Sequence, residues 1–171
     1  MHISIRPALL ADVPHLLALY KLLDLAPEPE MPIEQALARF QGLASRPGHQ
    51  IYVAEFEQQI VGTFALVFIG GLSHGARDSC IVEDVCVAHE MQSTGVGKQM
   101  MRFAMQRCAS GGCYKLVLSS HVNRSHAHQF YESLGFRKHG YSYLIDRFDV
   151  GEVGRWPAEL RQLDARAVPS E

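Results

Sequence analysis

A glycine-rich turn stands between an apolar run and a helical pattern, and it reads Gln92-Ser93-Thr94-Gly95-Val96-Gly97-Lys98. A strand that leads through such a turn into a helix directs several free backbone N–H groups at one point. The helix dipole adds positive potential there. Glycine lets a phosphate approach these amides closely and permits φ > 0. The turn therefore predicts a binding site for a phosphate-bearing ligand.

The spacing of this turn excludes two well-known phosphate loops. A Walker A loop needs a glycine where this chain has Gln92, and a hydroxyl residue where it has Gln99. The dinucleotide fingerprint G-x-G-x-x-G needs a third glycine where Met100 stands. What remains is Gln-x-x-Gly-x-Gly after a strand that reads Glu-Asp-Val-x-Val.

A second motif follows later in the chain, in the segment 123–136, which ends in Phe-Tyr-x-x-x-Gly-Phe. The two motifs, in this order and with one helix and one strand between them, resemble the acetyl-CoA-binding region of the GCN5-related N-acetyltransferase (GNAT) family. The specific match covers roughly residues 79–147, and the first half of the chain fits only the pattern of the fold.

This resemblance implies a mixed α/β GNAT fold. Its central sheet is mixed, mostly antiparallel and splayed between strands four and five, with about four flanking helices. It also implies acetyl-CoA as the cosubstrate, lying in the gap. No Cys/His spacing is typical of a zinc site, and no metal ion is expected. By resemblance, the cofactor-binding residues are Val85, Cys86, Val87, Gln92, Ser93, Thr94, Gly95, Val96, Gly97, Lys98, Asn123, His126 and Phe130.

Glu83 is the candidate general base. The reaction needs a neutral amine, and a carboxylate in a strand of Ile, Val and Cys is partly desolvated, which raises its pKa. In a regular strand Asp84 points to the opposite face. Two other roles stay open for Glu83: binding the substrate cation, or a structural hydrogen bond at a bulge.

Tyr131 is the candidate general acid, because the family's Phe-Tyr helix would bring this hydroxyl to the sulfur of coenzyme A. Core packing is the alternative, since Phe130 and Tyr131 stand on an amphipathic helix. Of the nearby histidines, His126 is a further candidate for a base or for a contact with the ribose phosphate.

The substrate is expected to be a small primary amine. Segments around Ile81 and Gly112 are similar to glucosamine-phosphate N-acetyltransferases, but enzymes for aminoalkylphosphonates, amino acids or drugs look about as similar. A phosphorylated amine would need a cation, and the candidates are Arg77, Arg124, Arg137 and Lys138. A protein or peptide acetyltransferase and a non-catalytic acetyl-CoA sensor remain alternatives.

Apolar alternation and helical spacing predict the order of the elements. Strands are expected over 2–6, 50–56, 60–70, 79–87, 114–119 and 137–148, and helices over 12–23, 33–43, 96–109 and 126–134. Asp12 and Ser125 are the expected N-caps. Residues 1–148 are predicted to form one domain. Residues 149–171 form a charged tail with Trp156 and a short helix over 158–167, either a free tail or a homodimer contact.

The composition of the chain limits the kinds of partner that it is expected to bind. The formal net charge is -2 and no block of like charges occurs, so no nucleic-acid partner is indicated. We find neither a signal-peptide pattern nor an apolar run long enough to span a membrane, and we expect a cytoplasmic protein without membrane contact. The four cysteines form no C-x-x-C pair and are expected to be buried free thiols.

Overall fold

The structure, a computed structural model, describes residues 1–23 and 31–143. The predicted tail helix, Trp156 and the end of the predicted last strand lie outside these residues. Residues 1–137 form one compact unit, and a second unit begins at Lys138.

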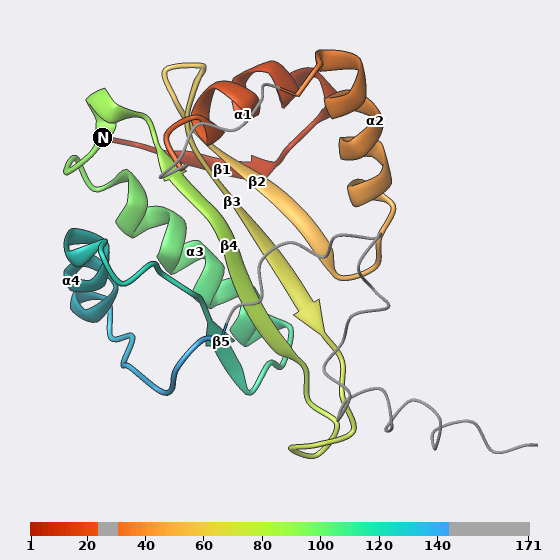
Figure 1. Cartoon of the computed structure of the whole chain (residues 1–171), viewed down its shortest axis with the longest axis vertical. Helices are drawn as coiled ribbons and strands as arrows, with labels where there is room; N and C mark the ends of the chain where they lie inside the picture. The colour runs from red at the N-terminus through yellow and green to blue at the C-terminus, as the bar shows by residue number, and fades with distance from the viewer. Residues whose placement is uncertain (24–30, 144–171) are drawn as a thin grey trace, which may run out of the picture. The chain divides into compact units, whose positions relative to one another are not determined.

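Within the described residues, five strands form one sheet in the order of the sequence, β1-β2-β3-β4-β5. The first four strands pair antiparallel, and β4 and β5 run parallel. The predicted mixed, mostly antiparallel sheet is therefore confirmed (Figure 1). The strands are β1 (Ser4–Pro7), β2 (His49–Phe56), β3 (Gln59–Ile69), β4 (Ser79–Val87) and β5 (Lys115–Val117).

In the part of the chain that the structure describes, four α-helices flank the sheet, as expected, with α1 and α2 on one face and α3 and α4 on the other (Figure 1). Two short 3-10 helices, η1 and η2, were not foreseen. The helices are η1 (Leu10–Asp12), α1 (Val13–Tyr20), α2 (Ile33–Ala44), η2 (His89–Met91), α3 (Val96–Ser110) and α4 (Ser125–Ser133).

Strand alternation explains why the sheet has two apolar faces. On β2 and β3, Tyr52, Phe64 and Leu66 face α3, where Met100 and Met101 are fully buried. The intervening residues, among them Ile51, Val53 and Ala65, face α1 and α2. The larger core therefore lies under α3, the helix that begins at the glycine-rich turn.

Several boundaries differ from the sequence-based predictions. Ser125 is the first residue of α4 and not its N-cap, which is Arg124. Asp12 occupies the N-cap position of α1 without capping that helix. Its carboxylate instead accepts the N–H of Leu9 at 2.7 Å and pairs with Arg6.

The last predicted strand is wrong in its described part, because residues 137–143 form neither strand nor helix. The predicted strand over 114–119 is reduced to β5, which ends at Val117. Cys80, Cys86 and Cys108 are buried free thiols as expected, and Cys113 is partly exposed.

Candidate active site

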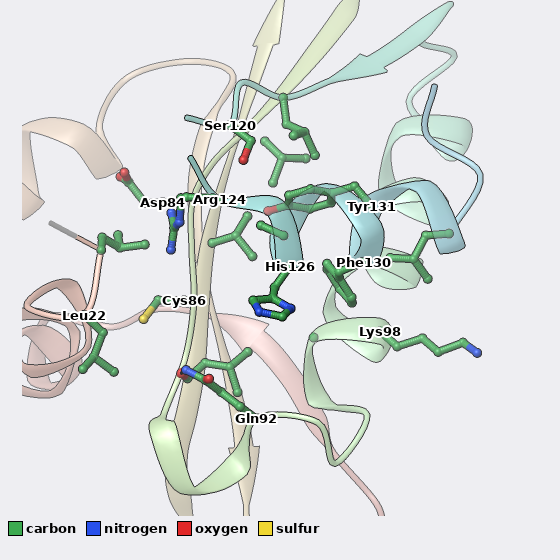
Figure 2. Close-up of a pocket in the computed structure, with 18 of the residues that line it drawn as sticks. Leu22, Asp84, Cys86, Gln92, Lys98, Ser120, Arg124, His126, Phe130 and Tyr131 are labelled. Atoms are coloured by element: carbon green, nitrogen blue, oxygen red, sulfur yellow. The ribbon is translucent and has the colours of Figure 1, made fainter. Parts of the chain in front are cut away.

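A cleft of about 790 Å³ opens where β4 and β5 diverge (Figure 2). The pairing of these strands ends at Ile81 and Val117, while β4 continues to Val87. The β4 edge from Val82 onward therefore faces the cleft and not a neighbouring strand. The expected splay between strands four and five is present, and it creates this cleft.

Four segments line the cleft: the free part of β4, the turn into α3, the residues after β5, and α4 with its preceding loop. Most predicted site residues come together here, namely Glu83, Val85, Cys86, Val87, Gln92, Ser93, Gly95, Gly97, Lys98, Asn123, His126, Phe130 and Tyr131. Thr94 and Val96 do not line it. Val96 is fully buried, and the Thr94 hydroxyl donates to the carbonyl of Met91 at 2.7 Å.

A β-bulge interrupts β4 beside the cleft. Thr63 faces Cys86 and Ala65 faces Glu83, so that one residue of β3 lies opposite two of β4. Asp84, one of these two, has φ 54°. The expectation that Asp84 lies opposite Glu83 assumed regular alternation, which the bulge breaks. Both residues line the cleft, and the Asp84 charge also acts on Tyr20 and His49 outside the lining.

The bulge also resets the direction of the following side chains. Val82 and Val85 both pack on the α3 side, although they are three residues apart. Cys86 turns to the α1 side, where its thiol donates to the carbonyl of Leu19 at 3.1 Å. Burial raises the pKa of this thiol, so it stays protonated near neutral pH.

Glu83 has the electrostatics of a weak base. Partial burial raises its pKa, and the negative charge of neighbouring Asp84 raises it further. The side chain remains accessible from the cleft. A solvent-accessible carboxyl with an upward-shifted pKa is suited to accept a proton.

The N-terminus of α3 presents unpaired backbone amides to the cleft. The first helical hydrogen bond runs from the N–H of Gln99 to the carbonyl of Gly95 at 3.1 Å, so the amides before Gln99 lack helical partners. No side chain caps this end, and Gly95 has φ 98°. A Cβ there would meet nothing within 4 Å, which leaves open space for a ligand. The geometry is that of an anion site.

Gly97 has a second role that its motif does not reveal. A Cβ at this position would lie 3.2 Å from the Phe130 ring and 3.7 Å from Val87. The missing side chain therefore lets α4 pack closely on the start of α3. Substituting Gly97 would disturb this contact as well as any bound anion.

Tyr131 projects its hydroxyl into the cleft toward β4 (Figure 2). Its ring packs on the core and lies edge-on to Phe136 with centroids 5.7 Å apart. Burial raises the pKa of the phenol, an effect that the charge of Arg124 partly offsets. The two interpretations of Tyr131 are thus compatible, because a packed ring positions a protonated hydroxyl.

Some of the polar groups expected to contact the cofactor form hydrogen bonds within the protein instead. The Gln92 amide donates to the carbonyl of Val87 at 3.2 Å, which removes this acceptor from the free edge of β4. The ring nitrogens of His121 and His128 bond to the backbone of the loop before α4, at Asn123 and His121 respectively. Of these two histidines and His126, only His126 lines the cleft.

Sequence reasoning missed several lining residues. Leu22 and Leu23 follow α1 and form an apolar wall. Ser120, just after β5, places a buried hydroxyl at the cleft, and this oxygen has no hydrogen-bond partner among the described residues. The signal for Ser120 is weak in the sequence, because it depends on where β5 stops pairing.

Within residues 1–23 and 31–143, no group of three or more His, Cys, Asp or Glu side chains is arranged to hold a metal ion. None of the helices in these ranges is long and apolar enough to cross a membrane.

The sequence model of the acetyltransferase (GNAT) family matches residues 16–136, which include every residue that lines the cleft. The chain belongs to the GNAT family. The match extends from α1 through α4 and thus covers both walls of the splayed sheet.

Two curated proteins are similar over part of their length. Glucosamine 6-phosphate N-acetyltransferase of Trypanosoma brucei brucei is 33% identical over 88 residues, 52% of this chain and 58% of that protein. The uncharacterized N-acetyltransferase YjgM of Escherichia coli K12 is 26% identical over 119 residues, 70% of this chain and 65% of that protein. The chain thus spans less than two thirds of both relatives.

Among solved structures, a putative acetyltransferase from Agrobacterium tumefaciens C58 superposes with a TM-score of 0.80 at 30% identity. The alignment covers 84% of this chain and 99% of that structure. The chain therefore shares the fold of this putative acetyltransferase over nearly all of that protein's length.

Proposed function

We propose that the chain is an acetyl-CoA-dependent N-acetyltransferase that transfers an acetyl group to the primary amine of a small molecule. One observation carries this proposal. The free edge of β4, the uncapped N-terminus of α3 and the Tyr131 hydroxyl all face the same cleft. These are the parts needed for a long phosphorylated thioester and an attacking amine.

The cleft fits acetyl-CoA, which when bound supplies the activated acetyl thioester. The amides between Gly95 and Lys98 would hold its pyrophosphate, since they are unpaired and lie at the positive end of a helix dipole. The backbone of Val85 and Cys86 would bond to its pantetheine arm as an added strand does. The carbonyl of Val87 already accepts from Gln92 and is a weaker candidate.

Glu83 and Tyr131 would divide the proton transfers. Glu83, with its raised pKa, would accept a proton from the substrate ammonium, directly or through water, and the neutral amine so formed would attack the thioester carbonyl. Tyr131, protonated near neutral pH, donates to the departing sulfur. Both side chains line the cleft, from β4 and α4 respectively.

We infer direct attack in a ternary complex and not an acetylated enzyme. Cys86 is the cysteine in the cleft lining, but its thiol is buried, donates to a backbone carbonyl and has a raised pKa. A protonated thiol engaged in a hydrogen bond is a poor nucleophile.

The test follows thiol release from acetyl-CoA with a panel of amino sugars and their phosphates, aminoalkylphosphonates, amino acids, polyamines, aminoglycosides and lysine peptides. Turnover of a compact amine, with intersecting initial-velocity lines, is expected. Parallel lines would indicate an acetyl-enzyme. Preference for lysine peptides would contradict the small-molecule proposal. Tight acetyl-CoA binding without any turnover would favour a sensor.

A further inference from the structure

The arginine that precedes α4 lines the cleft, and within residues 1–23 and 31–143 it forms no ion pair. Arg124 lines the cleft, and its backbone is fixed by two hydrogen bonds. Its N–H donates to His121 at 3.0 Å, and its carbonyl accepts from His128 at 3.1 Å. The Arg124 guanidinium makes neither an ion pair nor a hydrogen bond with another described residue. A partly buried guanidinium without a partner is poised to bind an anion.

Arg124 lies near the reacting end of the cleft. Burial raises the pKa of the Cys86 thiol and of the Tyr131 hydroxyl, and the positive charge of Arg124 partly offsets this rise at both groups, so Arg124 lies close to each. Figure 2 shows its side chain beside β4, and the Lys98 side chain directed away from it, beyond Phe130. The cleft therefore offers two places for an anion: the uncapped N-terminus of α3 and the Arg124 side chain. The α3 end suits pyrophosphate, and Arg124 lies apart from it.

The other candidate cations for a substrate anion lie elsewhere. Arg77 donates its Nε–H to the carbonyl of His74 at 3.2 Å in the loop after β3. Neither Arg77 nor Arg137 lines the cleft. Within residues 1–137, Arg124 is thus the arginine that can meet an acceptor substrate.

We propose that the acceptor is a compact amine that also carries an oxyanion group, a phosphate, phosphonate or carboxylate, and that Arg124 binds this group. This inference rests on the proposed acetyl transfer. Glu83 and Asp84 attract the ammonium end of the substrate, while Arg124 attracts its anionic end. The planar fork of a guanidinium bonds an oxyanion with two parallel hydrogen bonds, which orients the amine as well as holding it.

The experiment compares matched amine pairs that differ in the anionic group. Suitable pairs are ethanolamine with phosphoethanolamine, glucosamine with glucosamine 6-phosphate, and alaninamide with alanine. For at least one pair, kcat/KM for the anionic member should be higher by on the order of 10- to 100-fold, the range of a charged hydrogen-bonded contact. Arg124→Gln should abolish this preference by raising KM for the anionic amine, so that kcat/KM falls much more for the anionic member of a pair than for the neutral one.

Two controls separate the possible failures. Arg137→Gln removes an exposed arginine outside the cleft and should keep the preference. Calorimetric titration of Arg124→Gln with acetyl-CoA should give the wild-type affinity. Turnover of neutral amines with no anionic preference would overturn this inference and leave the acetyl transfer intact. A weakened acetyl-CoA affinity with an unchanged anionic preference would assign Arg124 to the cofactor. No turnover with any amine would instead reject the acetyl transfer itself.

Discussion

Asp84 holds a left-handed backbone conformation, and this one residue changes what the neighbouring carboxylate can do. Because of the bulge, Glu83 and Asp84 both line the cleft, where their negative charges interact. Burial is the first cause of the raised Glu83 pKa, and Asp84 is the second. The sequence pair Glu-Asp alone would have placed the two groups on opposite faces.

Asp84→Asn should therefore lower the pKa of Glu83. Asparagine tolerates the left-handed conformation, so the bulge should survive while one charge is removed. If deprotonated Glu83 is the base, the acidic limb of kcat/KM should move to lower pH. Glu90→Gln removes a carboxylate outside the cleft and should leave this limb in place. An unmoved limb in Asp84→Asn would assign it to the substrate amine or to another group.

We expect removal of the Ser120 hydroxyl to raise the stability of the protein and to weaken substrate binding. Its buried hydroxyl has no partner among the described residues, and such a group costs free energy on folding. Ser120→Ala should raise the free energy of unfolding by about 1 kcal/mol, and the melting temperature by about 2–4 °C. If a substrate supplies the missing partner, one of the two KM values should rise by roughly threefold to tenfold.

Thermal unfolding and steady-state kinetics on the same samples check this prediction. Ser119→Ala is the matched control, because Ser119 also lines the cleft but is exposed to water. It should leave the melting temperature unchanged. A lower melting temperature in Ser120→Ala would mean that the hydroxyl has a partner within the folded protein.

At the scale of elements, the spacing of apolar residues was sufficient to predict the four helices and the first four strands of the described residues. β2 and β3 are nearly continuous apolar runs, because both faces of this sheet are covered. The turn between them has positive φ at Glu57 and Gln58. The length of β5 was overestimated. Its apolar character continues past Val117, but these residues line the cleft and do not pair.

Site residues could be predicted from the sequence where a local motif requires a particular backbone conformation. Residues that reach the site through contacts between distant segments could not. The turn into α3 carries its conformational requirement at Gly95 in the sequence itself. The contact of Gly97 with Phe130 joins two helices and has no local signal. The wall at Leu22 and Leu23 likewise depends on how α1 lies on the sheet.

Asp12 connects β1, β2 and the start of α1 through Arg6. Its carboxylate accepts two hydrogen bonds from Arg6, at 2.6 and 3.1 Å, and Arg6 also pairs with Glu55 on β2 at 2.6 Å. Asp12 is 7% exposed. The hydrogen bonds from Arg6 are the main cause that lowers the pKa of Asp12. The ionised carboxylate therefore stabilises the joint between β1, β2 and the start of α1.

Asp12→Asn should lower the free energy of unfolding by about 2 kcal/mol at pH 7, since it leaves the Arg6 charge with one partner fewer. The folded pKa of Asp12 is depressed, so its contribution is present above the unfolded value of about 3.9 and is lost as pH falls through the folded value. The deficit of the variant should shrink below about pH 4. Urea titrations across pH measure this, with exposed Glu57→Gln as the control. A deficit that is constant with pH would show that packing, not charge, accounts for it.

At the scale of the whole molecule, the proposed chemistry is confined to one part of the chain. The compact unit ends at Arg137, the family match ends at residue 136, and the lining of the cleft ends at Leu134. Residues 149–171 make up the tail expected from the sequence, and they lie outside the described residues. The site can therefore be tested without this tail.

A chain that ends at Asp149 should fold, bind acetyl-CoA with the affinity of the full chain and keep its turnover, because each residue that lines the cleft lies earlier. Thermal unfolding, calorimetric titration and light scattering on both chains check these expectations. Insolubility of the shortened chain, or a change from dimer to monomer, would identify the tail as an assembly element. Trp156→Ala in the full chain should then reproduce that change, since a large aromatic side chain is the typical anchor of an interface.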